Sequence, residues 1–197
     1  MTDPRVQVTT WAVGSEPLGR ALVLPGVGYT VDHPLLFWTC HVLADAGWQI
    51  TLARWEIDPE ARAEADAFVG RAVDALDVQA PPARRTLVVA KSFGTHAAQW
   101  AADRGLPGVW LTPILTDTAV AQALTVSTAP ALLVGGTADE LWQGDVARAT
   151  GKQVLEIRGA DHALHVLGDW RSSVRALEQC LESVERFATA VLDRTDD

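Results

Sequence analysis

The stretch Thr-Leu-Val-Val-Ala-Lys-Ser-Phe-Gly-Thr-His-Ala-Ala-Gln-Trp, residues 86–100, decides the fold. Its first part, Thr86 to Ala90, is a short apolar run that predicts a buried strand, and His96 to Ala102 predicts a helix. Ser92 stands at the apex of the turn between them. A sharp turn of this kind strains the serine backbone and lifts its hydroxyl out of the sheet. The stretch therefore predicts a strand, a sharp turn and a helix, with the serine hydroxyl lifted out of the sheet at the apex of the turn.

The rest of the chain repeats this alternation of short apolar runs and longer segments of helical period. Such a pattern is typical of an α/β fold, and we expect a mostly parallel central sheet of about six or seven strands with helices on both faces. The first two strands are expected to pair as an antiparallel hairpin at the edge. The expected strands are Val6 to Ala12, Arg20 to Leu24, Gln49 to Ala53, Thr86 to Ala90, Gly108 to Leu111, Ala131 to Gly135 and Gln153 to Ile157. The longest expected helices are Pro34 to Ala46, Pro59 to Leu76 and Asp169 to Leu192.

Length and composition indicate a single domain over residues 1–197. The net charge of -9 and the pI near 4.9 oppose binding to nucleic acid and to anionic membrane surfaces. No apolar stretch reaches the length that spans a bilayer. Cys40 and Cys180 are too few for a disulfide framework, which favours a reducing compartment. We expect a cytoplasmic protein with neither nucleic acid nor membrane as a partner, and the oligomeric state is open.

The segment from Ala90 to Gly94 resembles the nucleophile elbow of the α/β-hydrolase family, which usually reads Gly-X-Ser-X-Gly. Alanine replaces the first glycine here, a change of one methyl group. The resemblance extends from about Arg20 to Leu192 and implies an α/β-hydrolase fold with Ser92 as nucleophile. An ordinary helix cap is the alternative interpretation of Ser92.

A serine nucleophile needs a base, normally an imidazole that a carboxylate holds in one tautomer. Asp139 follows the expected strand that ends at Gly135, and His162 follows the one that ends at Ile157. The order serine, aspartate, histidine, each beyond the carboxyl end of a strand, is what the family resemblance requires. The motifs Gly-Thr-X-Asp, which ends at Asp139, and Gly-X-Asp-His, which ends at His162, are also similar to the family's usual sequences at these positions. We therefore predict Ser92, Asp139 and His162 as catalytic residues.

Alternatives exist for each predicted partner of the serine. Glu140 and Asp117 are substitute acids, and His165, one helical turn after His162, is the rival base. Asp139 and His162 could also merely cap or pack at helix starts.

Backbone N–H donors are needed for the oxyanion, and the resemblance implies that Phe93, after the nucleophile, supplies one of them. The loop from Pro25 to Tyr29 is similar to the family's His-Gly-X-Gly loop, which implies Val27 or Gly28 as the second donor. The loop lacks the lysine and the Ser/Thr ending of a Walker motif, and its glycines do not match the dinucleotide spacing. No nucleotide, other cofactor or metal is therefore expected.

Side chains near this edge are candidates for binding the substrate: Tyr29, Lys91, Trp55, Trp110 and Trp142. Lys91 could steer an anionic substrate or lower a nearby pKa, but we expect a solvated or sheet-edge lysine. Core packing explains the tryptophans about as well. The segment Thr112 to Pro130 is too short for a lid domain, which predicts an open site for short acyl groups. We expect a serine hydrolase for esters or thioesters. The alternatives are a non-catalytic binding domain, or an acyltransferase or peptidase using the same triad.

Overall fold

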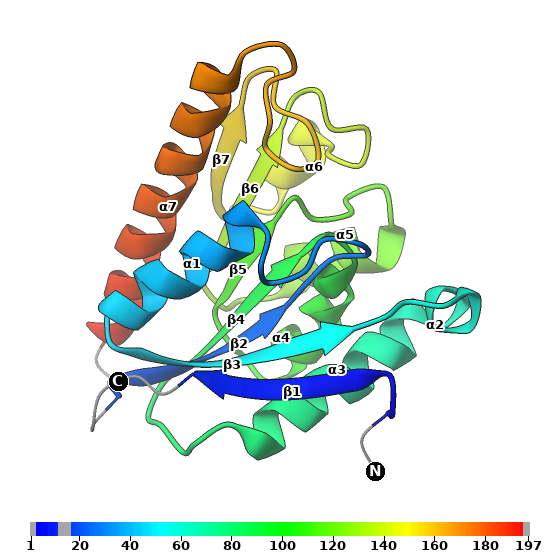
Figure 1. Cartoon of the computed structure of the whole chain (residues 1–197), viewed down its shortest axis with the longest axis vertical. Coiled ribbons are helices and arrows are strands. Elements are labelled where there is room, and N and C mark those ends of the chain that lie inside the picture. Colours follow the sequence, from blue (N-terminus) through cyan, green and yellow to red (C-terminus); the bar gives the residue numbers. More distant parts are fainter. Residues whose placement is uncertain (1–2, 12–16, 195–197) are drawn as a thin grey trace.

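A seven-stranded sheet of order β1-β3-β2-β4-β5-β6-β7 forms the centre of the computed structural model, which describes residues 3–11 and 17–194 (Figure 1). β1 is antiparallel to β3, and every other neighbouring pair is parallel. The mostly parallel sheet is thus confirmed. Ala12, the expected end of the first strand, lies outside the described residues. The strands are β1 (Val6–Trp11), β2 (Gly19–Leu24), β3 (Trp48–Trp55), β4 (Thr86–Lys91), β5 (Gly108–Leu111), β6 (Ala131–Gly136) and β7 (Gln153–Ile157).

The predicted hairpin between the first two strands is wrong. β1 pairs with β3, with Val6 opposite Trp55, while β2 has the parallel neighbours β3 and β4 on its two sides. Residues 21–24 of β2 are fully buried, whereas β1 buries Val6 alone. A strand that is apolar on both faces belongs inside a sheet, and a half-polar strand suits its edge.

Helices cover both faces of the sheet (Figure 1). On one face α1 (Pro34–Asp45) and α7 (Trp170–Leu192) pack over Val23 and Val89. On the other face α3 (Ala65–Gln79), α4 (Ala98–Asp103) and α5 (Thr118–Val126) pack over Leu22 and Val88. Because successive strand residues point to opposite faces, the same buried strands supply two separate cores. The shorter helices are α2 (Pro59–Ala63), the 3₁₀ helix η1 (Ser92–Ala97) and α6 (Gly144–Ala149).

The helix expected over Pro59 to Leu76 is divided into α2 and α3 at Glu64, whose φ of -113° and ψ of 39° are not helical. The two parts have different anchors. Asp58 caps α2 and pairs with Arg5, whereas α3 is held to the sheet by Phe68 and its apolar neighbours. The periodicity of the sequence does not reveal that α2 and α3 are held by different contacts.

The connection between β5 and β6 contains only α5 and short turns. No lid domain is inserted there, as expected. Among the described residues, no helix combines the length and the apolar character needed to cross a membrane.

Candidate active site

Ser92 lies at the elbow between β4 and η1 with a φ of 52°, in the left-handed region that side-chain-bearing residues rarely adopt. The expected backbone strain at this serine is confirmed. A β-carbon at Gly94 would lie 2.7 Å from the carbonyl oxygen of Leu24 and 2.8 Å from that of Pro25. Only glycine therefore lets η1 approach the end of β2 this closely, and this approach sets the direction of the elbow.

A chain of hydrogen bonds joins Ser92, His162 and Asp139. The Nε2 atom of His162 lies 2.7 Å from Ser92 Oγ, and its Nδ1 atom lies 2.8 Å from Asp139 Oδ2. An ionised carboxylate only accepts hydrogen bonds, so Nδ1 carries the proton and Nε2 is free to accept the serine hydroxyl. The Asp139 side chain is 1% exposed, and its other oxygen accepts the N–H of Leu141.

Two loops meet to bring the acid and the histidine together. A β-carbon at Gly136 would lie 2.1 Å from the carbonyl oxygen of Ala160, so glycine is required for this approach. The backbone N–H of Ala138 donates to the same oxygen at 3.0 Å, and Thr137 N–H donates to Ile157. The loop after β6 is thereby hydrogen-bonded directly to the loop after β7.

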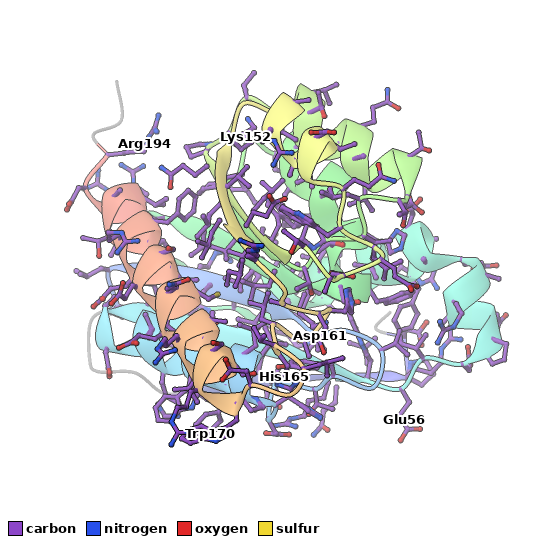
Figure 2. All side chains as sticks on the ribbon, turned by 90° about the horizontal axis from the view of Figure 1, so that it is seen from above. Glu56, Lys152, Asp161, His165, Trp170 and Arg194 are labelled. Carbon is purple, nitrogen blue, oxygen red and sulfur yellow. The ribbon has the colours of Figure 1, made fainter. Side chains whose placement is uncertain are left out.

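Asp161 holds the histidine loop in shape and was not singled out as a functional residue from the sequence. Its carboxylate accepts the backbone N–H groups of Ala163 and His165 at 2.8 and 2.9 Å. Figure 2 shows Asp161 and His165 on this loop, which leads into α7. The signal available in the sequence is an aspartate at the start of a turn, where its side chain commonly bonds the backbone ahead.

The competing site residues lie elsewhere. His165 is exposed, and its ring makes no hydrogen bond within the part of the chain that the structure describes. Asp117 caps α5 by accepting the N–H groups of Ala119 and Val120. Glu140 is exposed on the loop after Asp139. The structure therefore brings only His162 and Asp139 into line with the serine.

The loop from Pro25 to Tyr29 lies directly against the elbow. A β-carbon at Gly26 would lie 3.1 Å from Ser92 Cβ, and the Nε1–H of Trp55 donates to the Gly26 carbonyl. The backbone N–H groups of Val27 and Gly28 have no protein acceptor among the described residues. Phe93 lies in the first turn of η1, where backbone N–H groups lack partners within the helix.

Lys91 is the last residue of β4 and is buried, with 2% of its surface exposed, so of the two expected placements the solvated one is wrong. Its Nζ donates to the backbone carbonyl of His162 at 3.0 Å and lies 4.6 Å from the ring centre of Tyr29. Burial lowers the pKa of Lys91 to about 8, because desolvation disfavours the charged form. Tyr29 is itself half-buried, and its hydroxyl accepts the N–H of Leu35.

The tryptophans divide between core and site. Trp142 is 7% exposed, donates to Glu156 and packs against β6, while Trp110 is buried within β5. Trp55 is half-buried beside Phe93, with ring centres 6.1 Å apart. Of these three, Trp55 alone contacts both the elbow and the Gly26 loop.

A groove of about 540 Å³ adjoins Phe93. Part of its wall is formed where α2 meets α3, and part by the segment after β5. Its lining combines apolar and charged side chains, among them Arg62, Asp66, Phe93, His96, Ile114 and Asp117. The groove is therefore amphipathic rather than a deep apolar pocket.

No protein family and no curated protein matches the sequence, whereas many solved structures match the fold. Est1E from Butyrivibrio proteoclasticus, solved with ferulic acid bound, is 14% identical with a TM-score of 0.75, over 96% of each chain. XC6422 from Xanthomonas campestris, described as a serine hydrolase without lid, is 14% identical with a TM-score of 0.68, over 98% of this chain and 93% of that one. Dienelactone hydrolase from Anabaena variabilis is 17% identical with a TM-score of 0.67, over 94% and 92%. The chain thus has the α/β-hydrolase fold. One of the similar structures, XC6422, is a lidless form of this fold.

Proposed function

We propose that this chain is a serine hydrolase that cleaves an ester or thioester bond through an acyl-enzyme intermediate. The observation that supports this most directly is the continuous hydrogen-bonded path from Ser92 through His162 to Asp139, with distances of 2.7 and 2.8 Å. These residues follow three separate strands, β4, β6 and β7, and all three side chains meet at the carboxyl edge of the sheet. The fold and the α/β serine hydrolases among the similar structures agree with this function.

In the proposed reaction, Ser92 Oγ forms a bond to the substrate carbonyl carbon while its proton passes to Nε2 of His162. Asp139 stabilises the resulting imidazolium through the Nδ1–H bond. The tetrahedral intermediate then collapses, and the leaving group departs with the proton from Nε2. Water, deprotonated by the same nitrogen, attacks the acyl-enzyme, and the bond between Ser92 Oγ and the acyl carbon then breaks. Oγ takes the proton back from Nε2, and the acid is released.

The oxyanion in this proposal is bound by the backbone N–H of Phe93 and by that of Val27 or Gly28. Two features support the assignment: these N–H groups lack protein acceptors or stand in a first helical turn, and the Gly26 loop touches the elbow. Donors that are fixed before the reaction stabilise developing charge without further reorganisation.

For the substrate, we propose a short acyl group or an exposed acyl bond on a larger molecule. The absence of a lid between β5 and β6 and the charged lining of the groove beside Phe93 both argue against a long apolar chain. We also propose the cytoplasm as its compartment, because Cys40 and Cys180 are both free and buried.

The decisive experiment is labelling with a fluorophosphonate probe, followed by assays on esters, thioesters and aminoacyl amides. The wild type is expected to be labelled and to hydrolyse esters or thioesters, and Ser92→Ala is expected to lose both properties. Ser183→Ala is the matched control, because Ser183 is half-buried on α7 and its hydroxyl bonds Gln179 and Arg186 of the same helix rather than a residue of the site. Turnover of amides alone would indicate a peptidase, and transfer to an added acceptor rather than to water an acyltransferase. A folded wild type that neither labels nor turns over would overturn the proposal in favour of a binding domain.

A further inference from the structure

An ammonium group lies buried directly behind the proposed nucleophile. Lys91 precedes Ser92 in the chain, and its side chain is among the largest that are fully enclosed in the protein. Its stem lies against the Gly26 loop, since a β-carbon at Gly26 would stand 3.3 Å from Lys91 Cδ. Its Nζ reaches the backbone carbonyl of His162 and the face of Tyr29. One side chain therefore contacts both the histidine loop and the loop that carries the proposed oxyanion donors.

We propose that Lys91 is a positioning residue, whose buried ammonium ties the His162 backbone to the Gly26–Tyr29 turn and so aligns the imidazole with Ser92. This inference rests on the function proposed above. It differs from a role in substrate binding, because a charge that is 2% exposed has almost no surface to offer a ligand.

The need for such a tie follows from how His162 is held. The imidazole is hydrogen-bonded at Nδ1 by Asp139, but that bond fixes the ring and not the backbone behind it. Asp161 binds the N–H groups that follow, at Ala163 and His165. The carbonyl of His162, which belongs to the same peptide group as the Ala163 N–H, accepts from Lys91, so this peptide group is held at both its N–H and its carbonyl.

Burying a charge is costly, and the surroundings of Lys91 show how the charge is retained. The carboxylates of Asp139 and Asp161 attract the ammonium, and the Tyr29 ring provides a cation–π contact at 4.6 Å. An apolar side chain of similar size would pack there at lower cost. A lysine that is expensive to bury yet contacts two loops of the site is better explained by alignment than by stability.

The test compares Lys91→Met with Lys152→Met. Methionine keeps most of the stem and removes the donor and the charge. Lys152 is the chain's other lysine and also donates to backbone carbonyls, those of Ser127 and Ala129. It lies well away from Asp161 and His165 (Figure 2). The two variants thus lose the same interaction at different places.

We expect Lys91→Met to lower kcat by about 100-fold, the effect of misplacing a reacting group by about 1 Å. Its KM should stay within about threefold and its melting temperature should not fall. Lys152→Met should keep kcat within about twofold. An unchanged kcat in folded Lys91→Met, or a rise in KM alone, would overturn the inference while leaving the hydrolase function intact.

A second variant tests the proposal if Lys91→Met does not fold, and a second measurement tests it if the wild type is inactive. Lys91→Leu replaces Lys91→Met if the latter does not fold, with the same expectations. If the wild type is folded but inactive, the proposed function fails, and alignment is judged from the downfield proton resonance of His162 Nδ1–H. We expect this resonance in the wild type and in Lys152→Met, and its loss or broadening in the Lys91 variant. An identical resonance in all three would refute the positioning role.

Discussion

Gly136 and Ala160 are in direct backbone contact, because a β-carbon at Gly136 would lie 2.1 Å from the Ala160 carbonyl oxygen. This contact joins the loop of Asp139 to the loop of His162. Gly136→Ala must separate the two loops, and a displacement near 1 Å costs on the order of 100-fold in rate. We expect kcat/KM for a good ester substrate to fall by about that factor, measured where circular dichroism shows the variant folded.

Gly108→Ala is the control for this variant. A β-carbon there would meet the Trp110 ring at 2.6 Å, at the end of β5 that is remote from the site. Both substitutions should lower the melting temperature, and Gly136→Ala alone should slow the folded enzyme. Equal rates in the two folded variants would contradict the role of this loop contact.

Asp139→Asn tests the acid of the proposed triad. The amide can donate as well as accept, so it no longer enforces the tautomer with the proton on Nδ1. We expect kcat to fall by about 1,000- to 10,000-fold with little change in KM, as measured by steady-state kinetics. Glu140→Gln, next along the chain, should keep kcat within about threefold. A greater loss of kcat in this variant would move the acid to Glu140.

Gly94→Ala tests the packing that makes the elbow. The added methyl group would lie within 2.7 and 2.8 Å of two carbonyl oxygens, which belong to rigid backbone. We expect a loss of about 1 to 3 kcal/mol in the free energy of unfolding, measured in urea. Gly70→Ala, in α3 and with no atom within 4 Å of the new methyl group, should instead gain up to about 1 kcal/mol. A neutral Gly94→Ala would mean that the helix does not need this close approach.

The buried charge of Lys91 predicts a pH dependence of stability. Its pKa is lowered from 10.5 to about 8 by burial. Below pH 8 the amine is charged in both states and the cost of burial is complete. Between about pH 8 and 10.5 the folded protein has lost this proton while the unfolded chain keeps it, so the contribution of Lys91 to stability rises with pH.

Lys91→Met removes that cost. At pH 7 we expect the variant to be more stable than the wild type by up to about 3 kcal/mol, and the difference should shrink as the pH is raised from 8 to 10. Urea unfolding at several pH values measures it, with Lys152→Met for comparison. A difference that is constant over this range would show that the Lys91 pKa is not depressed.

The shape of the site predicts a preference for short acyl chains. The groove beside Phe93 has charged side chains in its wall, and the connection between β5 and β6 inserts no lid domain. On a series of nitrophenyl esters we expect kcat/KM to fall as the acyl chain lengthens beyond a few carbons, because added methylene groups find little apolar surface to contact. A steady rise with chain length would contradict an open site.

The sequence by itself determined the layered α/β architecture and the candidates for the site. Apolar runs, helical periods and the small residues around Ser92 are local patterns, and each reflects the burial or turn geometry of a short segment. The order of serine, aspartate and histidine after successive strands then placed them at one edge, because parallel strands share their carboxyl ends.

Tertiary structure alone decided which long-range contacts form. The pairing of β1 with β3, the choice of His162 over His165, and the burial of Lys91 all depend on segments far apart in the chain. No local pattern encodes these contacts. The same alternation of residues in β1 is compatible with more than one neighbouring strand, and the same lysine is compatible with more than one environment. Packing of the two cores and satisfaction of buried polar groups select a single arrangement among them.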